Sequence, residues 1–97
     1  MVEVALVVKL TAKAGMEEEL AEFLTGALPL ADDEPGTEVW MALRSDQSTF
    51  WIVDAFPGDA ERKAHLEGPI AEALFANAEH LLATAPEVNP ADVLAVK

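Results

Sequence analysis

The sequence predicts an α+β domain of the ferredoxin-like class, in which helices cover one face of a four-stranded antiparallel sheet. Two observations carry this prediction. Segments rich in β-branched and aromatic residues alternate with segments whose apolar residues recur every three or four positions, and turn residues separate them. The resulting order is β-α-β-β-α-β. A chain of 97 residues can hold one small core, so we expect a single domain over residues 1–97.

The first strand and the first helix have the clearest patterns. Residues 2–10 are rich in valine, and every even position among them is apolar. An apolar stripe then runs from Met16 to Leu28, which is typical of an amphipathic helix. We expect Pro29 to end or kink this helix. The acidic residues 32–36 that follow are predicted to form a solvated turn.

A hairpin and two further helices are predicted next. The hairpin strands span residues 37–44 and 49–56, and four polar residues join them. Asp59 is expected to cap a short helix, and Pro69 suits the first position of a longer helix that runs to about residue 83.

Two prolines make the C-terminal part the hardest to interpret. Pro86 and Pro90 are expected to bracket a loop, because proline cannot donate a backbone hydrogen bond. The last strand is therefore predicted over residues 92–97.

Composition excludes several classes of function. Eighteen acidic residues against six basic ones give a formal net charge of −12, which disfavours nucleic acid and anionic membrane surfaces as partners. Cysteine is absent, so no thiol nucleophile or cysteine-based metal site is possible. No segment approaches the length of a membrane span or has the features of a signal peptide, which predicts a soluble, cytoplasmic protein.

The predicted sheet is apolar on both faces, although two helical layers on the same side can cover only one of them. The second face would carry a tryptophan with valine and alanine side chains. Such a patch is rare on a monomer, and a second copy packed sheet to sheet would cover it. The sequence therefore predicts a homodimer.

Several short motifs together resemble the antibiotic biosynthesis monooxygenase family. Glu34-Pro35-Gly36 precedes a strand that carries Trp40, the next strand ends in Asp54-Ala55-Phe56, and Ala64-His65 lies on a short helix. The resemblance covers the chain from Val2 to Lys97. It implies a dimeric α/β barrel and the activity of a quinol monooxygenase, which oxidises a small aromatic substrate with O₂.

The chain also departs from the family pattern in ways that bear on cofactors. The family commonly has Glu and Trp at the positions of Asp54 and Phe56, and a second histidine that is missing after His65. Haem-degrading relatives use an Asn on the first strand, absent here, and a histidine close to where Phe75 stands. No metal-ligand spacing or phosphate-binding glycine loop occurs either. We therefore expect no cofactor and no metal.

His65 is the best candidate for a general base, because imidazole near its reference pKa can take a proton from a phenol. The alternative is a surface histidine beside Glu61, whose replacement would cost little stability. Asp54 is the second candidate, since an acid in an apolar strand needs a partner or a shifted pKa. Its alternative role is an ion pair with Arg44 or Arg62.

The substrate pocket is expected between the helices and the sheet. Asn77, on the inward stripe of the longer helix, could hydrogen-bond a substrate oxygen or be a satisfied core amide. His80, late in that helix, is expected to be exposed or to contact the helix end. The predicted pocket wall consists of Trp40, Phe23, Phe56 and Leu74.

Two functions remain open at this point. The first is a cofactor-independent monooxygenase acting on a quinol-like substrate. The second is a non-catalytic dimeric protein that binds a small ligand or assists an enzyme, because a fold does not determine a function.

Overall fold

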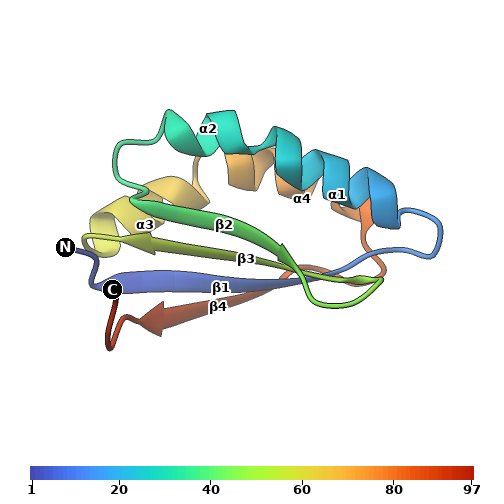
Figure 1. Ribbon diagram of the computed structural model, residues 1–97. Coiled ribbons are helices and arrows are strands. Elements are labelled where there is room, and N and C mark those ends of the chain that lie inside the picture. Colours follow the sequence, from blue (N-terminus) through green and yellow to red (C-terminus); the bar gives the residue numbers. More distant parts are fainter.

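The computed structural model describes residues 1–97 and confirms the ferredoxin-like class (Figure 1). The four strands form one antiparallel sheet in the order β2-β3-β1-β4. The elements along the chain are β1 (Val4–Thr11), α1 (Glu17–Gly26), α2 (Leu28–Asp32), β2 (Val39–Arg44), β3 (Thr49–Phe56), α3 (Asp59–Leu66), α4 (Pro69–Leu81) and β4 (Glu87–Asp92).

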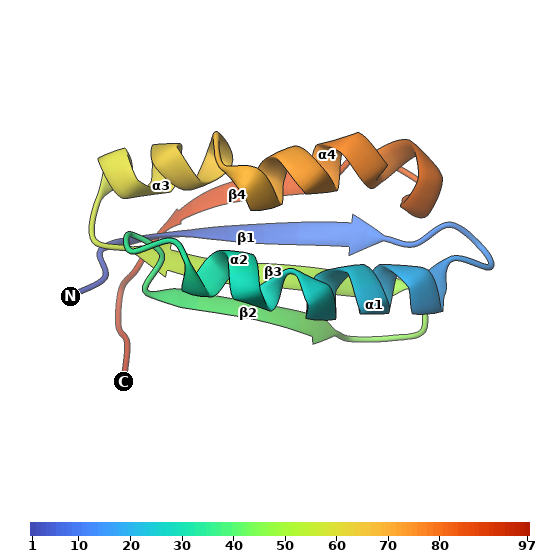
Figure 2. The same ribbon diagram turned by 90° about the horizontal axis from the view of Figure 1, so that it is seen from above.

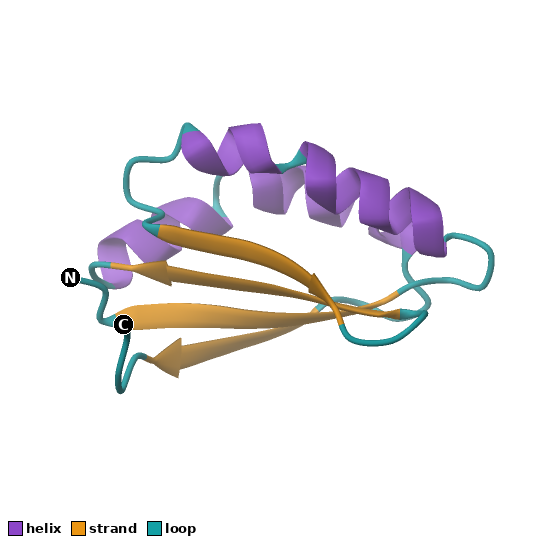
Figure 3. Cartoon of the chain, viewed as in Figure 1, coloured by secondary structure: helices purple, strands orange, loops and turns teal.

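All the helices lie on the same side of the sheet, and its opposite side carries no element (Figures 1 and 3). Seen from above, α1 and α2 follow one another along the β2–β3 side, while α3 and α4 follow one another along the β1–β4 side (Figure 2). None of these helices is both long and apolar enough to cross a membrane.

The main core lies between the sheet and the helices. The even positions of β1 and β3 supply it, because successive side chains of a strand point to opposite faces. Leu10 and Phe56 are fully buried there, and α1 contributes Leu20 and Leu24. The apolar even positions noted in the first strand therefore lie under the helices.

The uncovered face of the sheet is apolar but partly exposed. Met41 and Leu43 of β2 are 45% and 46% exposed, and Trp51 and Val53 of β3 are half-buried. Trp51, rather than Trp40, is the tryptophan on this face. Its ring nitrogen donates to Oγ of Ser45 at 2.8 Å, and Nζ of Lys9 lies 5.9 Å from its ring centroid.

The structure corrects the predicted end of the first helix. Helix α1 stops at Gly26, and Pro29 lies in the first turn of a second helix, α2, instead of ending the first. Proline is tolerated there because the amide hydrogens of a first helical turn have no partner within the helix. Asp59 is likewise the first residue of α3 and not its cap; Gly58 occupies the cap position.

The prediction for the last strand was wrong. Strand β4 spans Glu87–Asp92 and contains Pro90, which pairs in register with Leu6, whereas residues 93–97 form no strand. Because β4 is an edge strand, the missing amide hydrogen of a proline can face away from the sheet.

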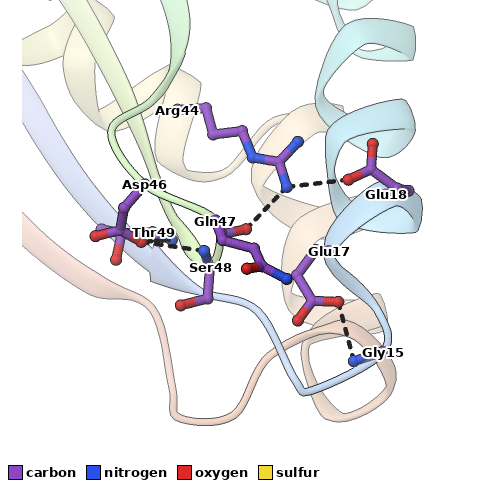
Figure 4. Close-up of polar contacts among 8 residues, drawn as sticks. All are labelled: Gly15, Glu17, Glu18, Arg44, Asp46, Gln47, Ser48 and Thr49. Atoms are coloured by element: carbon purple, nitrogen blue, oxygen red, sulfur yellow. Dashed lines mark hydrogen bonds and ion pairs between the residues drawn. The ribbon is translucent and has the colours of Figure 1, made fainter.

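The β2–β3 hairpin is tied to α1 by polar contacts that surround its turn (Figure 4). Arg44 donates to Glu18 of α1 at 3.0 Å and to the carbonyl oxygen of Gln47 at 2.8 Å. Within the turn, Asp46 accepts from the backbone amides of Ser48 and Thr49, and hydrogen bonds to these two residues lower the pKa of its carboxyl. Arg44 is therefore engaged far from Asp54.

Candidate active site

His65 is the only buried residue of α3. Its side chain is 6% exposed, and both ring nitrogens contact carboxyl groups from distant parts of the chain. Nδ1 lies 2.6 Å from Oε1 of Glu34, and Nε2 lies 3.0 Å from Oδ2 of Asp54. The first contact is a short hydrogen bond; the second is an ion pair whose N–H is not aligned well on the oxygen. The imidazole ring therefore bridges two acids.

Asp54 reaches the site from the middle of the sheet. It pairs in register with Leu6 on one side and Trp40 on the other, so its side chain points to the face that the helices cover. The side chain is completely buried, and its Oδ1 has no hydrogen-bond partner. A buried acceptor without a partner is costly, which makes this atom the first place to seek a ligand contact.

Glu34 reaches the site from the loop after α2. Thr37 donates its hydroxyl hydrogen to the same Oε1 at 2.7 Å, and the Glu34 side chain is 17% exposed. The other carboxyl oxygen, Oε2, is buried and has no hydrogen-bond partner. The loop sits closely on α3: a Cβ at Gly36 would lie 2.9 Å from Cγ of Glu61, and a Cβ at Gly68 would lie 3.3 Å from Oε2 of Glu34. These two glycines let the loop approach closely enough for Glu34 to reach the ring.

The two carboxyl groups control the protonation of His65. Burial alone would lower the pKa of the imidazole, but the hydrogen bonds and charges of Asp54 and Glu34 outweigh that effect and raise the pKa above 6.5. Protonated His65 carries a hydrogen on each nitrogen, which matches a carboxyl oxygen at each end. The site therefore favours an imidazolium ion between two carboxylates.

Two cavities meet at His65. The inner cavity has a volume of about 30 Å³ and lies between the sheet and helices α3 and α4; Asp54 and His65 are the only polar residues among its walls. The outer cavity has a volume of about 320 Å³ and lies between the α2–β2 loop and α3. Glu34 and His65 both line it. The imidazole ring is thus part of the wall of each cavity.

Some of the other predicted site residues lie near the Asp54–His65 pair, and one lies elsewhere. Leu74 lines the inner cavity, and the ring of Phe56 lies 5.3 Å from that of His65, centroid to centroid. Trp40 neighbours Asp54 in the sheet, and its buried Nε1 has no partner. Phe23, however, lines a separate groove between α1, α2 and α4.

Asn77 also lies apart from the site. Its side-chain amide donates to the carbonyl oxygen of Ala73, one turn earlier in α4, at 2.8 Å. The inner cavity is lined by Leu74 and Phe75 of this helix and not by Asn77. The observed contact matches the satisfied-amide alternative.

Three expectations about these residues are corrected. His65 is buried and does not sit on the helix surface beside Glu61. Asp54 pairs with His65, while Arg62 bonds Asp59 and the carbonyl oxygens of Ala5 and Ala91.

The third correction concerns Glu34, which the sequence analysis placed in a solvated turn. It is half-buried and contacts the histidine. The available signal was its place in the Glu34-Pro35-Gly36 motif, where a proline and a glycine fix the loop after an acid.

No group of three or more histidine and acidic side chains is arranged to hold a metal ion. Glu34 and Asp54 lie on opposite nitrogens of His65, so the three groups do not converge on one point.

Comparison with solved structures places the chain in a family. A Nitrosomonas europaea protein of unknown function is 50% identical, with a TM-score of 0.98 over 100% of this chain and 94% of that one. The chain belongs to the same family as that protein. No family model and no curated protein matches the sequence.

More distant structures share the fold. A Deinococcus radiodurans protein named "putative antibiotic biosynthesis monooxygenase" is 17% identical, with a TM-score of 0.84 over 97% of this chain and 95% of its own. A Chloroflexus aurantiacus protein of the same name is 21% identical, with a TM-score of 0.77 over 98% of this chain and 96% of its own. The resemblance found in the sequence is therefore confirmed as a likeness of fold.

Proposed function

We propose that the chain is a cofactor-independent monooxygenase that oxidises a small phenol or quinol with O₂. The observation that carries the proposal is the buried Asp54–His65 pair in the wall of an otherwise apolar cavity, with Oδ1 of Asp54 unpartnered. The names of the distant structural neighbours agree with this chemistry.

Oxidation of a phenol by O₂ needs few protein groups, because the substrate itself supplies the electrons. Loss of the phenolic proton makes the ring electron-rich enough to reduce O₂ directly. One oxygen atom is then bonded to the substrate, the O–O bond breaks, and the second oxygen leaves as water with two substrate hydrogens. A CH₂ unit of the keto form of the phenol thereby becomes C=O, a four-electron oxidation that matches the reduction of O₂. The protein must remove the first proton, stabilise the oxyanion and exclude water.

Asp54 is better placed than His65 to take that proton. Both ring nitrogens of His65 already face carboxyl groups, so neither is free for a substrate hydroxyl. Oδ1 of Asp54 is free, and the positive charge of the imidazolium stabilises the carboxylate from its other oxygen. In this proposal, Asp54 replaces His65 as the general base that the sequence predicted, and His65 acts as the partner of Asp54.

Trp40 is the proposed second polar contact. Its indole N–H is a donor without a partner on the strand next to Asp54. A phenol needs an acceptor for its hydrogen and a donor for its oxygen, and these two orphaned groups are of the two kinds required. Trp40 does not line the inner cavity as it stands, so its contact with the substrate would form only in the opened cavity. Leu74 provides apolar wall and Phe56 packs against the ring of His65, whereas Phe23 and Asn77 carry no role in this proposal.

Substrate entry requires movement at the rim of the inner cavity. A volume of about 30 Å³ accommodates a single water molecule and not an aromatic ring. Leu66 and Phe75 line the cavity and are 39% and 53% exposed. Rotation of these two side chains would open the cavity toward solvent without disturbing the core.

We propose a homodimer formed through the uncovered sheet face. Met41, Leu43 and Trp51 would lie in its centre, and the exposed Leu94 and Val96 of the C-terminal residues would add to it. Light scattering over a dilution series should give about twice the chain mass of 10.4 kDa. A stable monomer at micromolar concentration would contradict this arrangement.

Oxygen consumption with a panel of quinols, without added flavin or metal, tests the proposed reaction. Asp54→Asn should reduce turnover by roughly 10²–10⁴-fold, the range typical of a lost general base. Asp33→Asn is the matched control, because Asp33 is an exposed acid outside the inner cavity. Absence of turnover with every quinol would refute the monooxygenase.

The size of the inner cavity favours one second candidate, a dimeric protein that binds a small ligand without reaction. Quenching of tryptophan fluorescence measures ligand binding at Trp40. Quenching of wild-type fluorescence that is lost in Trp40→Phe, with no oxygen consumed, would support this candidate over the enzyme.

A further inference from the structure

The three acid–base residues connect two separate spaces. Asp54 lines only the inner cavity, Glu34 lines only the outer cavity, and His65 lines both. The contacts between them measure 3.0 Å and 2.6 Å, so the three titratable groups follow one another through the wall; the His65–Glu34 contact is a hydrogen bond and the Asp54–His65 contact is an ion pair. The rest of the wall of the inner cavity is apolar and cannot carry a proton.

We propose that Glu34 is the outer end of a proton path that carries the Nδ1 proton of His65 to the outer cavity when Asp54 takes a proton in the inner cavity. The path rests on the proposed function, because a substrate hydroxyl in the inner cavity supplies the proton to Asp54. It adds to that function a route by which the enclosed Asp54–His65 pair loses and regains a proton.

The transfers balance as follows. The substrate hydroxyl gives its proton to Oδ1 of Asp54 and becomes an oxyanion. The Nδ1 proton of the His65 imidazolium moves to Oε1 of Glu34, which releases it to water. The three side chains carry a total charge of −1 before and after, since one proton enters and one leaves. Asp54 later returns its proton to the oxygen that departs as water, and His65 is reprotonated through Glu34.

The surroundings of Glu34 suit the outer end. Its Oε1 accepts from the Thr37 hydroxyl as well as facing Nδ1, and its side chain is 17% exposed whereas that of Asp54 is completely buried. Oε2 is itself buried and has no hydrogen-bond partner, so the exposed part of the side chain does not include that oxygen. The outer cavity is lined by Asp33 and Glu61 as well, and by no lysine or arginine. No basic side chain of this cavity therefore competes with His65 for the Glu34 carboxyl group.

Exchange of the His65 ring proton with solvent tests the path without any substrate. In ¹⁵N-histidine NMR spectra of the full chain, Glu34→Gln should slow exchange at Nδ1 by about tenfold or more, since the amide cannot act as a base. Sodium formate, small enough for the outer cavity, should restore the exchange. Asp33→Asn, which removes a charge from the same cavity without touching His65, should exchange at the wild-type rate.

Glu34→Asp separates a relay from an electrostatic effect. This variant keeps the negative charge but withdraws the carboxyl group from Nδ1, so the path predicts slowed exchange that formate restores. Unchanged exchange in Glu34→Asp and Glu34→Gln, or equal slowing in Asp33→Asn, would overturn the path.

Turnover distinguishes failure of the path from failure of the proposed function. If wild-type protein oxidises a quinol, Glu34→Gln should be at least about tenfold slower with unchanged quinol affinity, and formate should restore the rate. Full activity in Glu34→Gln would refute the path and leave the monooxygenase standing. If no quinol is oxidised, the function falls, and the path is decided by the exchange rates alone.

Discussion

The two histidines of this chain form similar contacts in opposite surroundings. His80 of α4 lies 3.1 Å from Glu19 of α1, and its side chain is 62% exposed. His65 of α3 lies 2.6 Å from Glu34, and its side chain is 6% exposed. Exposed ion pairs contribute about 0–1 kcal/mol because water screens them. Water is excluded around His65. The charges of His65, Asp54 and Glu34 are therefore compensated mainly by one another.

The largest expected difference is in stability. His65→Ala should lower the free energy of unfolding by about 3 kcal/mol, because it leaves the buried Asp54 without a partner and Glu34 with only the Thr37 hydroxyl. His80→Ala should change it by less than about 0.5 kcal/mol. Urea denaturation of both variants at pH 6 measures the two values. Equal effects would show that burial does not distinguish the two sites.

The dependence of stability on pH should come from His65. Its pKa in the folded chain is raised above 6.5, so the folded chain holds a proton that the unfolded chain has lost. The contribution is therefore complete below about pH 6.5 and is lost as the pH rises through the folded pKa. The slope can reach about −1.4 kcal/mol per pH unit for one proton.

Urea midpoints between pH 6 and pH 9 measure this slope. The variant His65→Gln should flatten it, and His80→Gln should leave it unchanged. A flat wild-type profile would contradict the raised pKa of His65.

The smallest effect is expected at the exposed pair. Glu19→Gln removes the partner of His80 and should change the free energy of unfolding by no more than about 0.5 kcal/mol. Raising the salt concentration to 1 M should remove even this difference, because the Debye length is then about 3 Å. A larger effect that persists in high salt would mean that the exposed pair resembles the buried one.

Local patterns predicted most of the backbone. The strand Thr49–Phe56 has the predicted bounds, and α4 begins at Pro69 as its preference for the first helical turn indicates. The largest errors occur at Pro29 and Pro90, where a proline was interpreted as a break. In both cases the neighbouring elements decide whether the missing amide hydrogen matters, and that information is not local.

Only part of the candidate site could be predicted, because the contacts between its residues are not local in the sequence. Asp54 and His65 can be recognised from the sequence. Asp54 is an acid within an apolar strand, and His65 is a histidine on a predicted short helix. Glu34 does not stand out, since its sequence neighbours Asp32 and Asp33 are exposed acids. Glu34 differs from Asp32 and Asp33 only in the folded chain, where Gly36 lies close to Glu61 and Gly68 lies close to Glu34.

The sequence by itself determined the order of elements and the alternation of side chains along the first three strands, and it left open which tryptophan faces the helices. Side-chain alternation and helical periodicity act over a few residues, and burial of apolar surface enforces them. The tertiary structure decided which charged groups meet. Glu34 and His65 are 31 positions apart, and Asp54 belongs to a third element. Whether a histidine is an exposed side chain or a buried imidazolium depends on the water excluded around it, and only the packed chain excludes that water.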